Sequence, residues 1–346
     1  MEKRTLNELG EFGLIETITK DLVLTQDTTI KGVGDDAAVI DSGERYQLLG
    51  TDMLVEGVHF DLRYVPLKHL GYKAVVVNLS DIYAMNGRPE QITVSIALSS
   101  RFTLEAIEEL YEGIRLACKI YNVDLVGGDT STSISGLMIS ISALGTVAKD
   151  KVCYRDGANV GDLIVASGDF GGAYMGLQLL EREKAVFLAT KGVGVQPELT
   201  GFDYILERQL KPEARKDVID QLTDLKIQPT SMIDVSDGLA SECIHIARQS
   251  DVGITLYEEK IPIDPMTYET AREFGLDPTT CTMNGGEDYE LLFTIKQDDY
   301  EKIAANMLLK VIGHCTEKEE GYKLVLKDSS VHPFTAQGWD TFLKAD

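Results

Sequence analysis

The sequence predicts an α/β (α+β) protein built from two domains, each with two layers of secondary structure. Helical and strand-like patterns of apolar residues alternate in both halves of the chain. The length of 346 residues is about twice the most common domain size. A stretch rich in charge and glycine, residues 148–161, separates the two halves. We therefore expect one domain over residues 1–150 and a second over residues 151–346.

In the first half, the spacing of apolar residues predicts a helix, a strand, a second helix and two further strands. Apolar residues recur every three or four positions in the helices and at every second position from Gln91 to Leu98. Asn86-Gly87, followed by Arg88-Pro89, is a typical helix stop, and Thr103 is a typical N-cap. These five elements are expected at residues 67–85, 91–98, 104–121, 123–126 and 137–147.

In the second half, short apolar runs alternate with helical patterns in the same way. A glycine cluster at 168–172 is expected to open a helix. Residues 185–200 contain glycines and a proline, and we expect a surface loop or a lid there, of unassigned role. The remaining elements are expected as strands at 163–166, 231–235, 254–257 and 289–295, and as helices near 203–223 and at 239–249.

The composition is that of an acidic globular protein. Hydrophobic residues make up 44% and charged residues 26%, which excludes a mainly disordered chain. There are 33 basic and 56 acidic residues, a net charge of −23 that argues against nucleic-acid and anionic-membrane partners. The five cysteines are scattered, and the sequence has neither a signal peptide nor a membrane span. We therefore expect a cytoplasmic protein without a disulfide framework or zinc site.

Acidic residues recur beside small residues at six places, each after an apolar element. One such pair is usually a turn or a helix cap, but six together suggest a shared site. Carboxylates that converge without cations repel one another, and Mg²⁺ suits a few carboxylates combined with water and substrate phosphates. The sequence therefore predicts a magnesium-bridged phosphate site, with calcium as the less favoured variant. The six places are Gly34-Asp35-Asp36, Thr51-Asp52, Ser80-Asp81, Gly128-Asp129, Asp234–Gly238 and Gly285–Asp288.

Several familiar motifs are absent or incomplete. The sequence has no Walker-type phosphate loop and no complete dinucleotide-binding glycine loop. Asp169-Phe170-Gly171 spells a protein-kinase tripeptide, but its partner motifs are missing, so we interpret it as a turn that opens a helix. For His59 a substrate contact and a purely structural role stay open, and for Trp339 ring stacking and core packing stay open.

Eight sequence blocks, in order and over nearly the whole chain, resemble the thiamine-monophosphate kinase family. The resemblance implies the fold shared with aminoimidazole-ribonucleotide synthetase, with an N-terminal domain that forms a dimer interface and a C-terminal domain that closes over nucleotide and substrate. It also implies a homodimeric enzyme that converts ATP and thiamine monophosphate into ADP and thiamine diphosphate. The blocks are LNELGEFGLI, GDDAAVI, TDMLVEGVHF, NLSDIYAMNGRP, VGGDTS, YRDGA, DVSDGL and NGGEDYELLFT.

The same resemblance implies roles for individual residues. Several Mg²⁺ ions would be held at Asp36, Gly50, Thr51, Asp52, Asp81, Asp129, Asp234 and Asp237. ATP would contact Tyr111, Gly128, Asp129, Arg155 and Ser236, and thiamine monophosphate would contact His59, Glu287 and Trp339. Asp52, Asp129 and Asp237 would be the catalytic residues. Gly50 departs from the family, which often has threonine there, and this puts any metal contact through a hydroxyl in doubt.

The chemistry of such a reaction agrees with the residue types. The nucleophile would be an oxygen of the phosphate monoester, whose second pKa is about 6, so no general base is required. Direct in-line transfer is expected. Aminoimidazole-ribonucleotide synthetase is the alternative enzyme, and a non-catalytic metal or nucleotide sensor is the alternative class. The blocks GEFGLI and GGEDYELLF disfavour the first alternative, and intact carboxylates at all six places disfavour the second.

Overall fold

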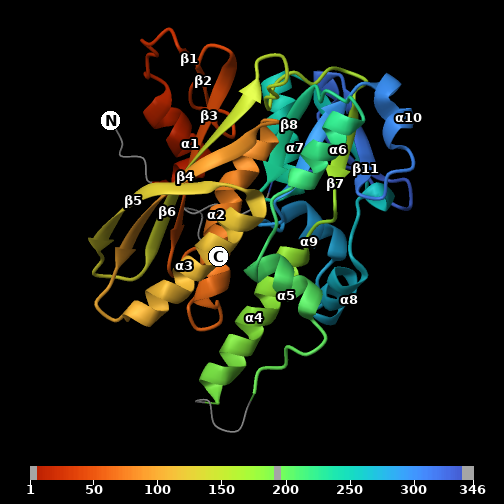
Figure 1. Ribbon diagram of the computed structural model, residues 1–346. Coiled ribbons are helices and arrows are strands. Elements are labelled where there is room, and N and C mark those ends of the chain that lie inside the picture. The colour runs from red at the N-terminus through yellow and green to blue at the C-terminus, as the bar shows by residue number, and fades with distance from the viewer. Residues whose placement is uncertain (1–5, 191–195, 337–346) are drawn as a thin grey trace.

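The computed structural model describes residues 6–190 and 196–336, which fold around two β-sheets (Figure 1). The first sheet has six strands in the order β1-β2-β3-β6-β4-β5, and only the pair β4–β5 is parallel. A kinked helix α1 (Leu6–Thr19) precedes it. The strands are β1 (Thr29–Lys31), β2 (Ala38–Asp41), β3 (Arg45–Val55), β4 (Arg88–Leu98), β5 (Asp124–Thr132) and β6 (Met138–Ala148).

Two long helices, α2 (Leu67–Ala84) and α3 (Leu104–Tyr121), cover one face of this sheet (Figure 1). They approach so closely that there is no room for a side chain at two positions of their contact. A Cβ atom on Gly71 would lie 2.0 Å from the carbonyl oxygen of Leu110, and one on Gly113 would lie 1.8 Å from that of Lys68. Glycine at both positions therefore sets the distance between the helices.

The second sheet has seven strands in the order β13-β12-β9-β11-β7-β10-β8. Its strands are β7 (Leu163–Ser167), β8 (Ser231–Val235), β9 (Gly253–Tyr257), β10 (Glu290–Ile295), β11 (Leu309–Thr316), β12 (Tyr322–Val325) and β13 (Val331–Pro333). The helices of this half are α4 (Gly172–Ala189), α5 (Asp203–Leu210), α6 (Lys216–Asp224), α7 (Leu239–Ser250), α8 (Pro265–Glu273), α9 (Pro278–Asn284) and α10 (Tyr300–Ile303).

Helix α2 packs against both sheets, on β3, β4 and β6 of the first and on β8 of the second. The largest apolar cluster is accordingly continuous across the two halves. It joins Leu79 of α2, Ile141 of β6, Ile219 of α6 and Phe293 of β10, all buried. A second cluster lies between α7 and the other face of the second sheet. The predicted boundary at residue 150 falls between β6 and β7 and remains a prediction.

Most predicted elements are confirmed by the structure, with ends that differ by a few residues. Thr103 caps α3 by accepting a hydrogen bond from the backbone N–H of Ala106, and Asn86 ends α2 in a left-handed conformation with φ 57°. The mixed α/β class is confirmed as well. No helix in the described ranges is long and apolar enough to cross a bilayer. All five cysteines are free.

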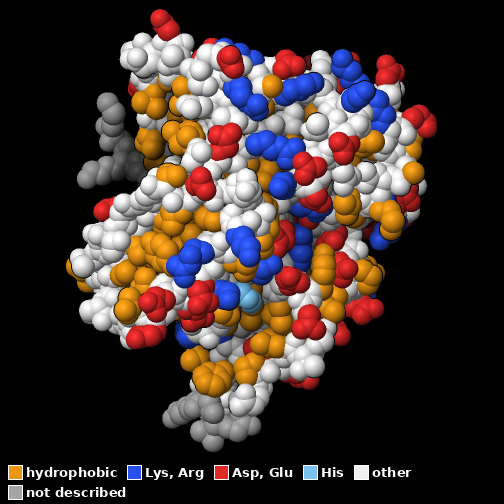
Figure 2. Space-filling view, viewed as in Figure 1, with side chains coloured by type: hydrophobic (Ala, Val, Ile, Leu, Met, Phe, Trp, Pro, Cys, Tyr) orange, Lys and Arg blue, Asp and Glu red, His pale blue; other side chains and the backbone are white. Residues whose placement is uncertain are grey.

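Two predicted boundaries were wrong. Strand β5 does not end at Val126 but continues through the Gly127–Ser131 motif, because the backbone there pairs with β4. The predicted loop at 185–200 begins later, since residues 185–189 continue α4. Residues 191–195 of that loop lie outside the described residues. Apolar side chains are exposed over β5 and α3 and at the tip of α4, where Phe187 lies (Figure 2).

The contact between α2 and α3 yields a prediction for stability. Replacement of Gly113 by alanine should lower the free energy of unfolding by about 1–3 kcal/mol, because the new methyl group would overlap the Lys68 carbonyl. Alanine's higher helix propensity, about 1 kcal/mol, would offset only part of this loss. Urea denaturation measures the difference. Gly127→Ala is the matched control, since a Cβ atom there has only Thr93 Cγ2 near it, at 4.0 Å; an unchanged midpoint in Gly113→Ala would contradict the packing argument.

Candidate active site

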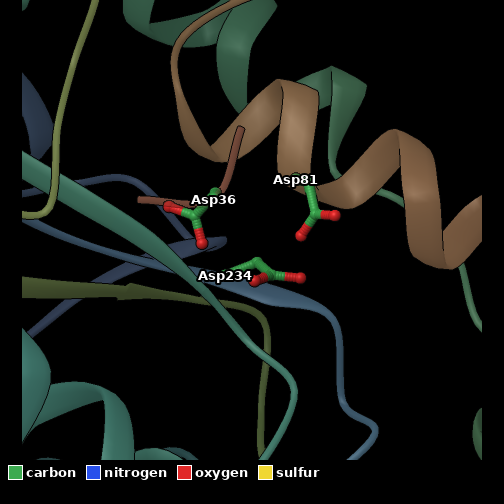
Figure 3. A group of neighbouring side chains, drawn as sticks. All are labelled: Asp36, Asp81 and Asp234. Atoms are coloured by element: carbon green, nitrogen blue, oxygen red, sulfur yellow. The ribbon is translucent and has the colours of Figure 1, made fainter. Parts of the chain in front are cut away.

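Three aspartates from distant parts of the chain converge on one point. One carboxylate oxygen each of Asp36, Asp81 and Asp234 lies within 4.8 Å of the other two (Figure 3). Asp36 lies in the turn before β2, Asp81 in the last turn of α2, and Asp234 near the end of β8. The position of α2 between the two sheets brings these segments together. All three residues belong to the metal-ligand set predicted from the sequence.

The cluster is only partly compensated by positive charge. The Arg155 guanidinium donates hydrogen bonds of 2.6 and 3.2 Å to Asp36 Oδ1, and the Ser80 hydroxyl donates one of 2.5 Å to Asp234. The second carboxylate oxygen of Asp36, Oδ2, is buried and has no hydrogen-bond partner among the described residues. An unpartnered buried carboxylate oxygen is costly, which makes it a natural position for a cation.

Burial and mutual repulsion raise the pKa values of these acids. Desolvation, then Asp52 and Asp234, holds the pKa of Asp81 well above its usual range. Desolvation and the nearby charge of Asp36 raise the pKa of Asp234 to about 8. Carboxyl groups that resist ionisation when they lie close together would ionise readily beside a hard divalent cation. The electrostatics of the cluster therefore fit a metal centre.

Gly50 and Asp52 of β3 lie on the face of the first sheet that is turned toward this cluster. A Cβ atom on Gly50 would lie 3.5 Å from Asp81 Oδ2, so the backbone of β3 passes close to the carboxylates. Asp52 keeps some exposed surface, but the protein packed around its carboxyl group, together with the charges of Asp36 and Glu11, raises its pKa. Asp52 thus belongs electrostatically to the same group of acids.

Thr51 and Asp129 lie on the opposite face of the sheet. The Thr51 hydroxyl donates to the carbonyl of Ile141 and contacts the hydroxyl of Ser142. Asp129 is paired with Ser95 of β4, whose side chain is on the exposed face because its neighbours Val94 and Ile96 are buried. The structure therefore separates these two side chains from the three converging aspartates. Gly128 lies beside Asp129 in β5, and Tyr111 packs on the main core cluster from α3.

The Asp234–Gly238 segment forms a tight loop between β8 and α7. The Glu242 carboxylate accepts hydrogen bonds from the backbone N–H groups of Ser236 and Asp237, at 3.2 and 2.9 Å. Glu242 is buried, and desolvation followed by the charge of Asp237 holds its pKa well above the usual range. Glu242 is not among the predicted site residues, although an acid at the fourth position of a helix that follows an acidic turn ending in glycine was a possible signal.

A second group forms around Glu287. Its carboxylate pairs with the Lys73 ammonium at 2.7 Å and accepts a hydrogen bond of 2.8 Å from the Gln209 side chain. His59 accepts from the backbone N–H of Val55 through Nδ1, and desolvation, offset in part by Glu287, lowers its pKa. His59, Lys73 and Gln209 line one small cavity of about 10 Å³. Trp339, the third predicted substrate contact, lies outside the described residues.

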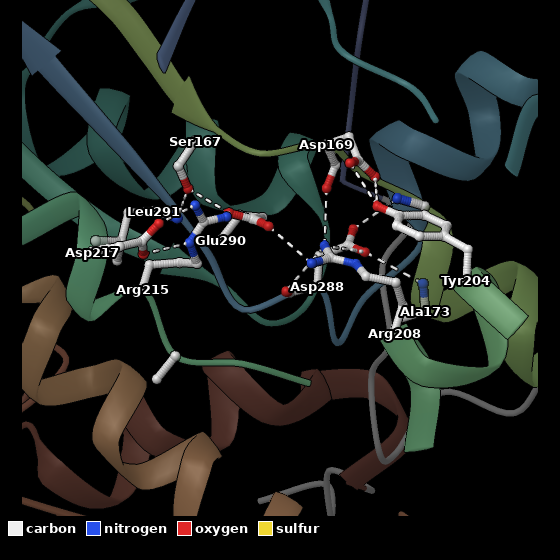
Figure 4. A network of polar contacts seen from close by, with 12 residues as sticks. Ser167, Asp169, Ala173, Tyr204, Arg208, Arg215, Asp217, Asp288, Glu290 and Leu291 are labelled. Carbon is white, nitrogen blue, oxygen red and sulfur yellow. Dashed lines mark hydrogen bonds and ion pairs between the residues drawn. The ribbon is translucent and has the colours of Figure 1, made fainter. Parts of the chain in front are cut away.

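Buried ion pairs support the segment that carries Glu287 (Figure 4). Arg208 pairs with Asp288 and Glu290, and Arg215 pairs with Glu290. Asp288 in turn accepts hydrogen bonds from the backbone N–H groups of Gly171 and Ala173 at the start of α4. The tripeptide Asp169–Gly171 is therefore a turn that opens a helix, as predicted. The network itself was not predicted, since its members are far apart in sequence.

Comparisons with known proteins place the chain in a family. Residues 34–147 match the family model described as AIR synthase related protein, N-terminal domain. The thiamine-monophosphate kinase of Aquifex aeolicus is 34% identical over 338 residues, which cover 97% of this chain and 99% of that protein. The enzyme of the same name from Bacillus subtilis is 32% identical, over 96% of this chain and 100% of that protein.

The chain belongs to the thiamine-monophosphate kinase family. The family's fold is evident in a solved structure described as AaThiL complexed with AMPPCP and TMP. That structure superposes with a TM-score of 0.82 at 32% identity and covers 98% of this chain and 99% of its own. The resemblance inferred from the eight sequence blocks is thereby confirmed, and so is the two-sheet architecture of the family.

The aspartate cluster yields a prediction about pH. Because the pKa of Asp234 is raised in the folded state, the folded protein binds more protons than the unfolded chain between pH ~4 and ~8, and its stability must fall as pH rises through that window. In EDTA, the free energy of unfolding should therefore be at least about 1 kcal/mol lower at pH ~8.5 than at pH ~5.5. Urea unfolding of wild type and Asp234→Asn measures this, and the variant should show a shallower dependence. Equal slopes in the two proteins would argue against the buried repulsion.

Proposed function

We propose that this protein transfers the terminal phosphoryl group of ATP to thiamine monophosphate, giving ADP and thiamine diphosphate. The observation that carries the proposal is the nearly full-length similarity to AaThiL, a protein crystallised with AMPPCP and TMP. It is supported by the convergence of Asp36, Asp81 and Asp234, because phosphoryl transfer depends on positioning and charge neutralisation rather than on covalent chemistry.

The donor set of the cluster fits magnesium. It consists of carboxylate oxygens, which hard divalent cations prefer, and includes the unpartnered Oδ2 of Asp36. Asp36, Asp81 and Asp234 would hold the first ion, with Asp52 and the backbone at Gly50 beside them. When bound, Mg²⁺ would neutralise phosphate oxygens and align them for in-line displacement. The predicted ligand roles of Thr51, Asp129 and Asp237 remain predictions, and so do the catalytic roles of Asp52, Asp129 and Asp237.

The residues of the chain would act by binding and orientation. Arg155 already compensates Asp36, and we expect its guanidinium, at the edge of the cluster, to contact a phosphate of ATP as well. Gly128, Tyr111 and Ser236 remain the other predicted nucleotide contacts. The acceptor phosphate is largely ionised at neutral pH, so the mechanism needs no proton acceptor. The lowered pKa of His59 keeps that imidazole neutral, which suits a hydrogen-bonding role toward substrate.

We expect the protein to be a homodimer that pairs through the outer face of its first sheet. On β3, Leu49 and Met53 are 43% and 54% exposed. They are paired with Leu144 and Ser140 of β6. Together with Thr51, Ser142, Thr93 and Ser95, these side chains form an uncharged strip, with Asp129 of β5 beside Ser95 at its edge. Two copies of the protein that pair through this face would bury it, and two-fold dimers are the commonest closed assembly. The acidic surface and the free cysteines support a cytoplasmic location.

The function is tested by mixing purified protein with ATP, magnesium and thiamine monophosphate and measuring thiamine diphosphate. Wild type should form the product, and Asp52→Asn should lose about 100-fold or more in kcat. The reason is that the Asp52 carboxylate would help to hold the cation that neutralises the charge developing on the phosphate. Its urea midpoint should stay close to that of wild type. Turnover of Asp52→Asn within a few-fold of wild type would exclude the assigned role.

The dimer is tested separately by light scattering coupled to size exclusion. Met53→Glu should shift the protein toward the monomer mass, because a buried, unpaired carboxylate at the interface is costly. Leu104→Glu, at an exposed position 69% open to solvent at the start of α3, serves as the control and should leave the mass unchanged. A wild-type protein that runs as a monomer at micromolar concentration would refute the assembly.

A further inference from the structure

Glu287 is held in an uncommon backbone conformation by contacts from several elements. Its φ is 65°, in the left-handed region that non-glycine residues rarely adopt, and Tyr289 has a φ of 51°. The backbone N–H of Glu287 donates to the carbonyl of Ser236 at 2.7 Å, and that of Tyr289 donates to Val235 at 2.8 Å. Strain of this kind persists where surrounding structure over-determines it, often at ligand sites.

Both oxygens of the Glu287 carboxylate are bonded by different helices. Lys73 of α2 approaches Oε1 at 2.7 Å, and the side-chain amide of Gln209 in α5 donates to Oε2 at 2.8 Å. Lys73 also donates to the backbone carbonyl of Gln209 at 3.2 Å. Lys73 is only 4% exposed, so its charge is compensated by Glu287 and the Gln209 carbonyl rather than by water. It is therefore not free to bind a substrate phosphate.

Gln209 has a spare acceptor. The residue is 5% exposed, and its side-chain oxygen Oε1 is buried without a hydrogen-bond partner in the described part of the chain. The orientation of the amide follows from chemistry, because only the NH₂ group can donate to a carboxylate. Buried acceptors are rarely left unpaired, so this oxygen calls for a donor.

The position of Gln209 is set by close packing. A Cβ atom on Gly176 of α4 would lie 2.9 Å from Gln209 Cβ and 2.1 Å from the Ile205 carbonyl, so α4 and α5 touch at this point. Gln209 also lines the cavity of about 10 Å³ that His59 and Lys73 share. A space of this size holds about one water molecule or a group of similar size, such as an amino group.

We infer that Lys73 and Gln209 are specificity-determining residues which orient Glu287, and that the Glu287 carboxylate and Gln209 Oε1 together accept from an N–H donor of the substrate. This inference rests on the proposed function. Within thiamine monophosphate, the exocyclic amino group of the pyrimidine ring is the N–H donor, whereas the phosphate offers acceptors. The cluster therefore recognises the pyrimidine end, away from the reacting phosphate.

Steady-state kinetics of Gln209→Met and Lys73→Met test the assignment, with Gln228→Met as the matched control. Gln228 also donates through its amide, to the Lys151 carbonyl, and also has a buried Oε1 without a partner, but it lies outside this cluster. Both cluster variants should raise KM for thiamine monophosphate about tenfold or more, the effect of losing one charge-assisted hydrogen bond. Their kcat and KM for ATP should stay within about threefold of wild type, as should all constants of Gln228→Met.

A second probe separates recognition from general structural damage. The analogue of thiamine monophosphate with an oxo group in place of the amino group cannot donate in the same way. Wild type should prefer the natural substrate by about tenfold in kcat/KM, and Gln209→Met should lose most of that preference. In a Glu287→Gln background, the effect of Gln209→Met on KM should shrink, since the two residues act together.

The outcomes distinguish the two levels of the proposal. A wild-type protein that forms no thiamine diphosphate would overturn the proposed function and this inference with it. Wild-type turnover combined with an unchanged KM for thiamine monophosphate in Gln209→Met, or with an unchanged preference against the oxo analogue, would overturn the specificity role alone. Equal changes in KM for both substrates would also overturn it, because they would indicate a general disturbance of the fold.

Discussion

The convergence of Asp36, Asp81 and Asp234 is the constraint on which the rest of the structure depends. Three carboxylates within 4.8 Å of one another would repel strongly in a buried setting. Arg155 compensates part of their charge, and the Ser80 hydroxyl donates one hydrogen bond to Asp234. Their positions come from a turn, a helix and a strand that belong to different halves of the chain. A core that is continuous from the first sheet through α2 to the second sheet supplies the apolar stabilisation that opposes this repulsion.

The pairing of β8 with β10 connects the aspartate cluster with the group around Glu287. Asp234 on β8 is directly opposite Leu291 on β10, and Glu287 lies just before β10 begins. The network of Arg208, Asp288 and Glu290 fixes the start of the same strand. One pair of strands therefore sets the distance between the proposed phosphate site and the proposed site for the rest of the substrate. Buried ion pairs suit this purpose, because they specify geometry even where they add little stability.

The two faces of the first sheet have separate roles in this picture. The inner face carries Gly50 and Asp52 toward the cluster, while the outer face presents Leu49, Thr51 and Met53. The period of two along β3 puts neighbouring residues of one motif on opposite faces. Thr51-Asp52 and Gly128-Asp129 are each contiguous in sequence, but only the fold decides which side chain faces the cluster. On the proposed dimer, the outer face would be buried against a partner.

Local patterns in the sequence were sufficient to predict most helices and strands and the chemical type of the site. Some signals depend only on residues a few positions apart, so they can be recognised without tertiary information. These are the apolar periods of 67–85 and 104–121, the cap at Thr103 and the stop at Asn86. The recurrence of aspartate beside small residues likewise indicated a cation site before any geometry was known. Where pairing between strands decides the conformation, as in β5 across Gly127–Ser131, local pattern was insufficient. Lys73 and Gln209 escaped notice for the same reason: their partner Glu287 lies far away along the chain, and only the packing of α2 and α5 creates the contacts that give them a role. Glu242 differs, because its partners Ser236 and Asp237 are close in sequence, but the turn that aims their N–H groups at its carboxylate is visible only in the structure.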